Sequence, residues 1–424
     1  MQERLLQFIW QFRYYNQRQL ILNNGVLLEV LHPGTLNHHQ GPDFQQACLR
    51  IDGILWVGQV ELHIRSSDWF VHSHHLDSLY KNVILHVVWE DDVNNPDDPI
   101  PVLTLQNLVP KLLLQQYEEW MHSRQFIPCQ HQMMQVSPLV LTAWQDRLLA
   151  ERLQRKSGHV LEVFQQSRQH WEETCWWLLA RNFGLKVNAD AFEAVARSLP
   201  LNLLARHRNS LLHLESLLLG QAGLLNASFS YDYPLLLKKE YEFYRTKYSL
   251  RPVHLPVYFL RMRPPSFPTI RLAQLAMLLH TTQQFFRRLL ETTELKELRL
   301  LLNVTAGEAW DLHYTLEEEA PPRKKHMGEE FTDTLLLNTV IPLLFAYGCW
   351  KNEQLYKDRA VRWLQQLPAE RNSIIRSFRL IGAELHNAFE SQAMIELKTQ
   401  YCDRRKCLDC ALGNNLISSH WPSS

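Results

Sequence analysis

Glycine is scarce in this chain: the 424 residues contain only 14, against 13 tryptophans and 18 phenylalanines. Many-stranded β-sandwiches need glycine-rich turns, so this scarcity, together with clustered leucines, favours helices. An excess of one charge is also missing, because 44 lysines and arginines balance 44 aspartates and glutamates. The chain as a whole is therefore not an obvious polyanion binder. Its 46% hydrophobic content predicts a globular protein with a large core.

Long uninterrupted apolar runs are missing too. The charged opening at residues 1–4 leads into an amphipathic helix, so we expect no signal peptide. The most apolar segment, 335–350, contains Asn338, Pro342 and Gly348 and is too short and interrupted for a bilayer span. We expect a buried helix there, and no membrane partner.

Paired cysteines are also missing. The seven cysteines are an odd number, and only three of them are close together in the sequence. The scattered ones are Cys48, Cys129, Cys175 and Cys349. This spacing argues against a disulfide framework and predicts a reduced, cytoplasmic protein.

Hydrophobic patterning divides the chain into three expected parts. Residues 1–107 contain β-rich runs and turns and predict a small α/β core. Residues 108–400 have leucines at helical spacing and predict a larger all-helical domain, and residues 401–424 carry the cysteine cluster. We therefore expect an α+β fold. Residues 1–110 hold 6 basic and 12 acidic residues, which leaves the remainder at +6 (38 basic against 32 acidic).

The first motif combines Asp43, which follows Gly-Pro, with Glu61 and His63. Between them, Asp-Gly at 52–53 is flanked by β-formers and predicts a tight two-residue hairpin turn. Side chains alternate between the two faces of a strand, so Glu61 and His63 share one face.

The register of this hairpin decides whether the motif is a site. Across a two-residue turn at 52–53, paired positions sum to 105, which sets Asp43 opposite Leu62 on the wrong face. A bulge near Gly58 would set Asp43 opposite His63 instead. Glycine inside a strand is a usual mark of a bulge, and bulges are common beside active sites. We therefore expect a bulge at Gly58 and three converging side chains.

These residues resemble the metal core of the PD-(D/E)xK nuclease superfamily, whose pattern is Asp, a spacer, and Glu-x-Lys on the next strand. His63 stands where that family has lysine. The resemblance implies a restriction-endonuclease-like mixed sheet, with Mg²⁺ or Mn²⁺ held by Asp43 and Glu61. It also implies that His63 orients or deprotonates the attacking water molecule. Glu29 would be the accessory acid of the preceding element. A solvated face of an ordinary sheet is the alternative interpretation of the same residues.

A second cluster consists of His72, His74 and His75. A His-x-His-His run can bind zinc, although surface histidines without a metal are at least as common. His86 lies inside an apolar strand, where a hydrogen-bonded core histidine is the more usual role.

The third motif is Cys402-x4-Cys407-x2-Cys410. Three cysteines this close in a reduced protein indicate a metal site, and Cys129 is the best candidate for a fourth ligand. The pattern resembles iron–sulfur nucleases of the CRISPR and recombination systems, with a different trio spacing. Zinc and a [4Fe–4S] cluster are both expected candidates.

Arginines also flank a proline-rich stretch. Arg261, Arg263 and Arg271 could clamp a nucleic-acid phosphate. Exposed arginines on a packing loop are the commoner explanation.

Together, several strings identify the chain as resembling a bacterial family known as domain of unknown function 2851, over essentially its whole length. The strings are 41–44, 60–63 with 68–69, 82–88, 220–224, 263–271 and the cysteine trio. We expect a metal-dependent nuclease that hydrolyses phosphodiester bonds of DNA. The alternatives are a non-catalytic nucleic-acid-binding or scaffold protein with the nuclease fold, and a zinc-dependent hydrolase that uses the histidine cluster.

Overall fold

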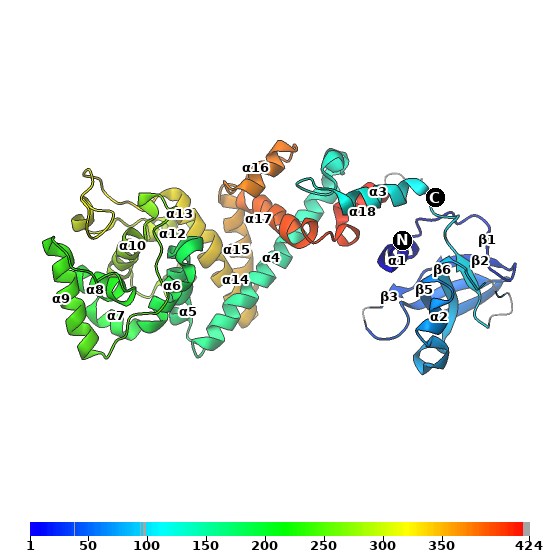
Figure 1. Ribbon diagram of the computed structural model, residues 1–424, viewed down its shortest axis with the longest axis horizontal. Helices are drawn as coiled ribbons and strands as arrows, with labels where there is room; N and C mark the ends of the chain where they lie inside the picture. The colour runs from blue at the N-terminus through cyan, green and yellow to red at the C-terminus, as the bar shows by residue number, and fades with distance from the viewer. Residues whose placement is uncertain (38, 94, 96–98, 419–424) are drawn as a thin grey trace. The chain divides into compact units, whose positions relative to one another are not determined.

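The computed structural model describes all residues except 38, 94, 96–98 and 419–424 (Figure 1). The chain forms two compact units. Unit 1 combines Met1–Gln145 with Arg376–Ala383 and Ile395–Ser424, and unit 2 combines Asp146–Ile375 with Glu384–Met394. Both units are therefore built from stretches that are far apart in the sequence.

Unit 1 contains a seven-stranded mixed sheet in the order β1-β2-β4-β5-β6-β7, with β3 paired to β4. Antiparallel pairs join β1 through β5, whereas β5, β6 and β7 are parallel to one another. The strands are β1 Leu20–Ile21, β2 Leu27–His32, β3 Thr35–Leu36, β4 Phe44–Ile51, β5 Ile54–Arg65, β6 Val83–Glu90 and β7 Val102–Thr104. A mixed sheet followed by many helices confirms the expected α+β class.

The parallel pairing of β5 and β6 requires a crossover connection. Residues 66–82 supply it with α2 (Asp68–Val71), η1 (His74–Leu76) and η2 (Ser78–Tyr80). The opening helix α1 (Glu3–Gln11) packs on β5 and buries its apolar residues. These two elements flank the strand that carries Glu61 and His63.

The hairpin between β4 and β5 turns where the sequence predicts. Ile51 pairs with Ile54, and Asp52 and Gly53 have φ values of +50° and +77°, as a type I′ turn requires. The adjacent pairs keep the sum of 105 as far as Ala47 and Gly58.

The prediction of a bulge at Gly58 is wrong. The register of β4 and β5 shifts between Phe44 and Ala47, so the extra residue lies in β4, where Gln46 has a left-handed φ of +58°. Gly58 serves close strand packing instead, because a Cβ there would lie 2.5 Å from Ile84 Cγ2. The pairing of β5 with β6 is irregular at the next position, between Gln59 and Val60.

The rest of unit 1 is helical. Its elements are α3 (Lys111–His122), η3 (Gln130–Gln135), the start of α4 (Pro138–Gln166), η7 (Leu397–Cys402), η8 (Cys407–Asp409) and α18 (Ala411–Ser418). The C-terminal elements contact the N-terminal segment, since Tyr14 Oη donates to Asn414 Oδ1 at 2.6 Å and Arg4 forms an ion pair with Asp409.

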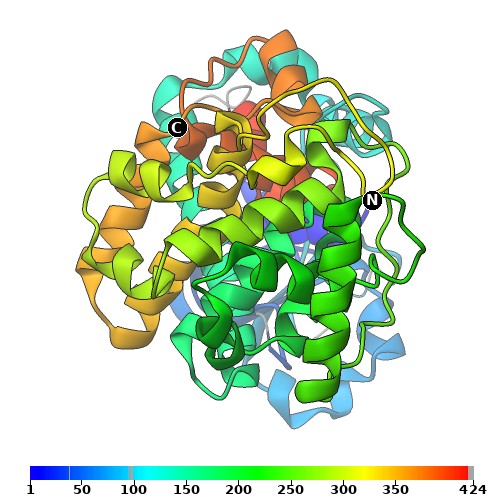
Figure 2. The same cartoon turned by 90° about the vertical axis from the view of Figure 1, so that its left-hand side faces the viewer.

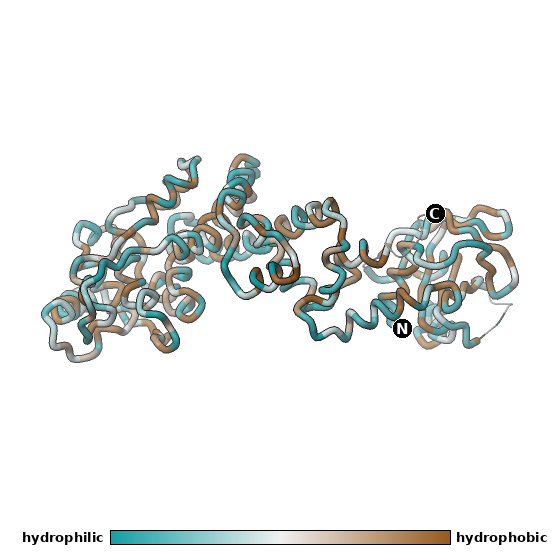
Figure 3. The backbone as a smooth tube through the Cα atoms, turned by 90° about the horizontal axis from the view of Figure 1, so that it is seen from above, coloured by the Kyte–Doolittle hydropathy of each residue, from teal (hydrophilic) through white to brown (hydrophobic). Residues whose placement is uncertain are grey.

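Unit 2 is a helical assembly (Figure 2). Its helices after α4 are α5 (Trp171–Phe183), α6 (Leu185–Ser198), α7 (Leu201–His207), α8 (Leu211–Gln221), α9 (Asp232–Lys247), α10 (Pro268–Thr281), α11 (Phe285–Glu291), α12 (Leu295–Leu302), α13 (Glu329–Leu335), α14 (Ile341–Lys351) and α15 (Gln354–Gln366). Later, α16 (Ser373–Leu380) and α17 (Ala388–Glu396) span the boundaries between units. Figure 3 shows apolar and polar positions alternating along these helices, as in amphipathic helices.

One helix among the described residues has the length and composition of a membrane span. It runs over Glu329–Lys351, and 72% of its most apolar window is buried. A buried core helix passes the same test, and this burial fits the helix expected at 335–350.

Candidate functional site

Asp43, immediately before β4, holds Glu61 in place. Its backbone N–H donates to Glu61 Oε2 at 3.0 Å. Both oxygens of its own carboxyl group accept hydrogen bonds, Oδ1 from Gln7 Nε2 at 2.8 Å and Oδ2 from the Leu62 N–H at 3.1 Å. Glu61 is only 5% exposed, so this network fixes a buried carboxyl group.

The two acids have strongly raised pKa values. Burial, and then the charge of Glu3, raise the pKa of Asp43 to about 7. Burial, and then the charge of Asp43, raise the pKa of Glu61 to about 8. Two buried carboxylates this close repel each other, so a cation beside them would favour their ionised forms.

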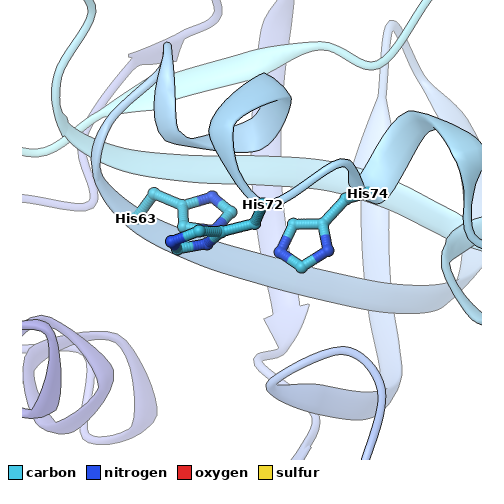
Figure 4. A group of neighbouring side chains, drawn as sticks. All are labelled: His63, His72 and His74. Carbon is cyan, nitrogen blue, oxygen red and sulfur yellow. The ribbon is translucent and has the colours of Figure 1, made fainter.

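Three histidines gather beside Glu61. His63 on β5 is 2% exposed, and its Nε2 lies 3.1 Å from His72 Nδ1 and 3.6 Å from Glu61 Oε1. His74 Nε2 lies 3.4 Å from the same Glu61 oxygen. One ligand nitrogen from each histidine lies within 4.8 Å of the others. Figure 4 shows the three rings together beside β5.

The crossover delivers His72 and His74 to this point. His72 ends α2, His74 begins η1, and Ser73 between them has a left-handed φ of +59°. Trp69 anchors the turn, with its ring 5.4 Å from that of His74. The Tyr80 ring stacks on that of His74, with the ring centroids 3.9 Å apart.

The surroundings lower the pKa values of His63, His74 and His86 and so favour their neutral forms. Burial, and then the neighbouring His86, lower the pKa of His63 to about 3. Burial, and then His74, lower the pKa of His86 to about 4. Burial also lowers the pKa of His74. A neutral imidazole has a free lone pair, which is the form that binds a metal ion.

The donor set fits a zinc-class ion. Zn–N bonds of about 2.0–2.1 Å in a tetrahedron place neighbouring ligand atoms about 3.3–3.4 Å apart. The nitrogens of His63 and His72 lie 3.1 Å apart, and one nitrogen of each of the three histidines lies within 4.8 Å of the other two, so a small inward shift of the rings would bring them to this spacing. Mg²⁺ prefers oxygen ligands in an octahedron, and the Asp43 oxygens already accept hydrogen bonds. The histidines therefore fit zinc better than the carboxyl groups fit Mg²⁺.

Some predicted residues converge and others do not. Asp43, Glu61 and His63 lie together, as the geometric prediction required, and His72 and His74 join them. Glu29 lies elsewhere in the sheet, exposed and ion-paired with Arg50. His75 is exposed, with its ring 5.5 Å from that of Phe70.

His86 takes part in the site although the sequence marked it as an ordinary core histidine. It is 4% exposed, and its Nε2 lies 2.9 Å from His63 Nδ1. From the sequence we also interpreted His63 and the His72–His75 run as separate clusters. The parallel register of β5 and β6 was the missing signal, because it returns the connecting segment over β5.

The three arginines do not form one exposed group. Arg261 and Arg263 are exposed, whereas Arg271 on α10 is only 7% exposed. Its guanidinium lies 3.5 Å from the centre of the Phe331 ring, and Nη1 donates to Gln274 Oε1 at 2.8 Å. Arg271 thus packs within unit 2.

The three cysteines of the third motif and Cys129, all among the described residues, belong to unit 1, although no three of their sulfurs lie within 4.8 Å of one another. Cys402, Cys407 and Cys410 are buried, and each of the seven cysteines is free. The pKa of Cys129 is raised, first by burial and then by Cys410 and Cys407, which lie near it.

Comparison with known proteins gives one match. No curated protein and no solved structure is similar to the chain at a significant level. The sequence model of one family, described as "Protein of unknown function (DUF2851)", matches residues 3–373. This match spans most of the chain and confirms the resemblance to this family, although it ends before the cysteine trio and says nothing of a nuclease. The chain belongs to the DUF2851 family.

Proposed function

We propose that this protein is a metal-dependent hydrolase whose ion is held by His63, His72 and His74, with Glu61 as the proton acceptor. One observation carries the proposal: a ligand nitrogen from each of His63, His72 and His74 lies within 4.8 Å of the other two, and Glu61 Oε1 lies 3.6 and 3.4 Å from the nitrogens of His63 and His74. His72 is exposed, so the site is open to solvent on its side.

The surrounding residues have distinct roles in this proposal. His86 faces Nδ1 of His63 and so directs Nε2 towards the ion, as the outer partners of metal-binding histidines do. Asp43 fixes the second oxygen of Glu61 and leaves Oε1 facing the histidines. When bound, the ion would supply Lewis-acid polarisation and lower the pKa of a water molecule.

Glu61 is suited to move the proton. An efficient general base has a pKa near the working pH. Burial, and then Asp43, raise the pKa of Glu61, and the positive charge of a bound ion would lower it again. Glu61 Oε1 lies within 3.6 Å of the Nε2 atoms of His63 and His74. A water molecule bound to an ion that these histidines hold would therefore be within reach of Glu61.

A second candidate is a Mg²⁺- or Mn²⁺-dependent nuclease that acts on DNA. It is supported by Asp43 immediately before β4 and by Glu61 and His63 on the adjacent antiparallel β5, which is the order that the nuclease resemblance requires. The acidic Glu3, Asp68 and Asp77 beside the site oppose a polyanion unless bound cations neutralise them. Such a reduced enzyme would work in the cytoplasm, and its free cysteines suit that compartment.

Metal analysis and hydrolysis assays together test the proposal. We expect the purified chain to bind one zinc-class ion at this site and to hydrolyse at least one of a set of phosphodiester, carboxyl-ester and amide substrates. His72→Ala should lose the ion and the activity. Glu61→Gln should keep the ion and lose the activity, and His75→Ala, the matched control, should retain both.

Each other outcome has a defined meaning. Zinc binding that is equal in His72→Ala and the parent would refute the histidine centre. DNA cleavage with Mg²⁺ or Mn²⁺ that is lost in Asp43→Ala but kept in His72→Ala would establish the nuclease instead. Metal binding without hydrolysis of any substrate, DNA included, would favour the non-catalytic binding protein.

A further inference from the structure

The C-terminal cysteines lie on a short, tightly turned segment. Cys402 ends η7, Cys407 begins η8, and Cys410 immediately precedes α18. The turns are closed by backbone hydrogen bonds, from Arg405 N–H to Cys402 O at 3.2 Å and from Cys410 N–H to Cys407 O at 3.3 Å. The three side chains are 7–8% exposed.

A distant segment brings the fourth cysteine to this trio. Cys129 lies just before η3, and η3 packs against α18. Arg405 donates to the Ser123 carbonyl, and the Ser137 N–H donates to Asn415 Oδ1 at 3.3 Å. These contacts hold residues on both sides of Cys129 against the cysteine segment.

The thiols lie close enough to affect one another. The pKa of Cys402 is raised mainly by burial, and further by Cys410, Cys129 and Cys407. The pKa of Cys407 is raised by burial and then by Cys410. Three buried cysteines and the half-buried Cys129, from two segments, therefore lie in one region of unit 1.

Hydrogen-bond donors are already directed at this region. The backbone N–H groups of Leu412 and Gly413 face the Cys410 sulfur and act to lower its pKa, although burial acts more strongly and raises it. Gly413 permits this approach, because a Cβ there would lie 2.3 Å from the Cys407 carbonyl oxygen. N–H donors to sulfur stabilise thiolates more than neutral thiols.

We propose that Cys129, Cys402, Cys407 and Cys410 form a four-thiolate metal centre that is separate from the histidine site. Zinc and a [4Fe–4S] cluster both use four cysteine thiolates. Around one zinc the sulfurs would lie about 3.8 Å apart, whereas no three of the sulfurs of these four described residues lie within 4.8 Å of one another, which favours the larger cluster over zinc. The positive charges of Lys398 and Arg405, which act on Cys402 and Cys407, partly compensate the negative charge of such a centre. The competing interpretation is four neutral thiols that pack as small hydrophobic groups.

Elemental analysis of the full-length chain, purified without oxygen, tests the proposal. We expect one zinc, or about four irons with acid-labile sulfide and a brown colour, per chain in addition to any ion at the histidine site. His72→Ala should leave this amount unchanged, and Cys129→Ser should lose it. Cys349→Ser, which changes an exposed cysteine on α14, is the matched control and should retain it.

A labelling experiment on the parent chain covers the case in which Cys129→Ser fails to fold. In native conditions, Cys349 should react with iodoacetamide at once, whereas the four proposed ligands should react only after the metal is removed. Zinc would be removed by a chelator, and the cluster by oxidation. Absence of both metals after reconstitution, or equal labelling of the four thiols before and after metal removal, would overturn the proposal.

Discussion

A buried acid in unit 2 allows a quantitative test of the structure. Glu215 on α8 is 0% exposed. Its Oε2 accepts hydrogen bonds from Tyr233 Oη at 2.6 Å and Trp310 Nε1 at 2.9 Å, while Oε1 has no partner among the described residues. Burial outweighs these two hydrogen bonds and raises the pKa of Glu215 from 4.5 to about 7. The perturbation is Glu215→Gln, which keeps the shape and removes the ionisation.

The sign of the effect follows from proton linkage. Between pH 4.5 and about 7 the folded chain keeps a proton on Glu215 that the unfolded chain has lost, so the free energy of unfolding falls as the pH rises. A shift from 4.5 to about 7 corresponds to about 3 kcal/mol at 1.36 kcal/mol per pH unit. Near pH 4 the pH-dependent part of the free energy of unfolding should therefore be equal in Glu215→Gln and the parent. Near pH 8 it should be larger in Glu215→Gln by up to about 3 kcal/mol.

Urea unfolding followed by tryptophan fluorescence measures this difference, since Trp310 contacts the acid directly. The difference in unfolding free energy between Glu215→Gln and the parent should grow from pH 4 to pH 8. Glu317→Gln, at an exposed position, should show a constant difference. A Glu215→Gln difference that is equally constant over this pH range would refute the reasoning.

Three other substitutions test local packing and the proposed centre. Gly158→Ala in α4 meets open space and should raise the free energy of unfolding by about 1 kcal/mol in urea denaturation, because alanine is the better helix former. Gly220→Ala would place a Cβ 2.2 Å from the Tyr241 ring, so it should lower stability by about 1–3 kcal/mol, and an unchanged melting temperature would contradict the close packing of α8 and α9. His86→Ala should leave the number of ions bound by the histidine site unchanged but weaken their affinity about 10–100-fold in a competition titration, and equal affinity would exclude a role for His86 in positioning His63.

Local sequence rules predicted the hairpin but not its irregularity. Asp-Gly at 52–53 determines the turn through two residues with positive φ, so sequence alone was sufficient there. The bulge depends on which strand has the extra residue. Gln46 carries no sequence signal for a left-handed conformation, whereas Gly58 does, yet Gly58 is required by the contact with Ile84 on β6. A glycine within a strand can indicate either a bulge or a close contact with a neighbouring strand, and the sequence alone does not distinguish the two.

The candidate site was predicted in pieces. Asp43, Glu61 and His63 could be joined because one hairpin connects them. Joining His72 and His74 to them requires the path of the β5–β6 crossover, and the sequence of that segment does not determine its path. The cysteines were easier to group, because three are close in sequence and Cys129 follows the sheet. The burial of Arg271 could not be predicted, because charged residues in helices are mostly exposed and nothing in the local sequence distinguishes this one.

The position of Cys129 has a consequence for the order of events during synthesis. Cys402 follows it by 273 positions (402 minus 129), and nearly all of unit 2 is encoded between them. At roughly 5–20 residues per second, the ribosome needs roughly 14–55 s to pass from one cysteine to the other. During that time the sheet of unit 1 has emerged while the segment that packs against Tyr14 and Cys129 does not yet exist. A nascent chain would therefore expose this part of unit 1 until the end of translation.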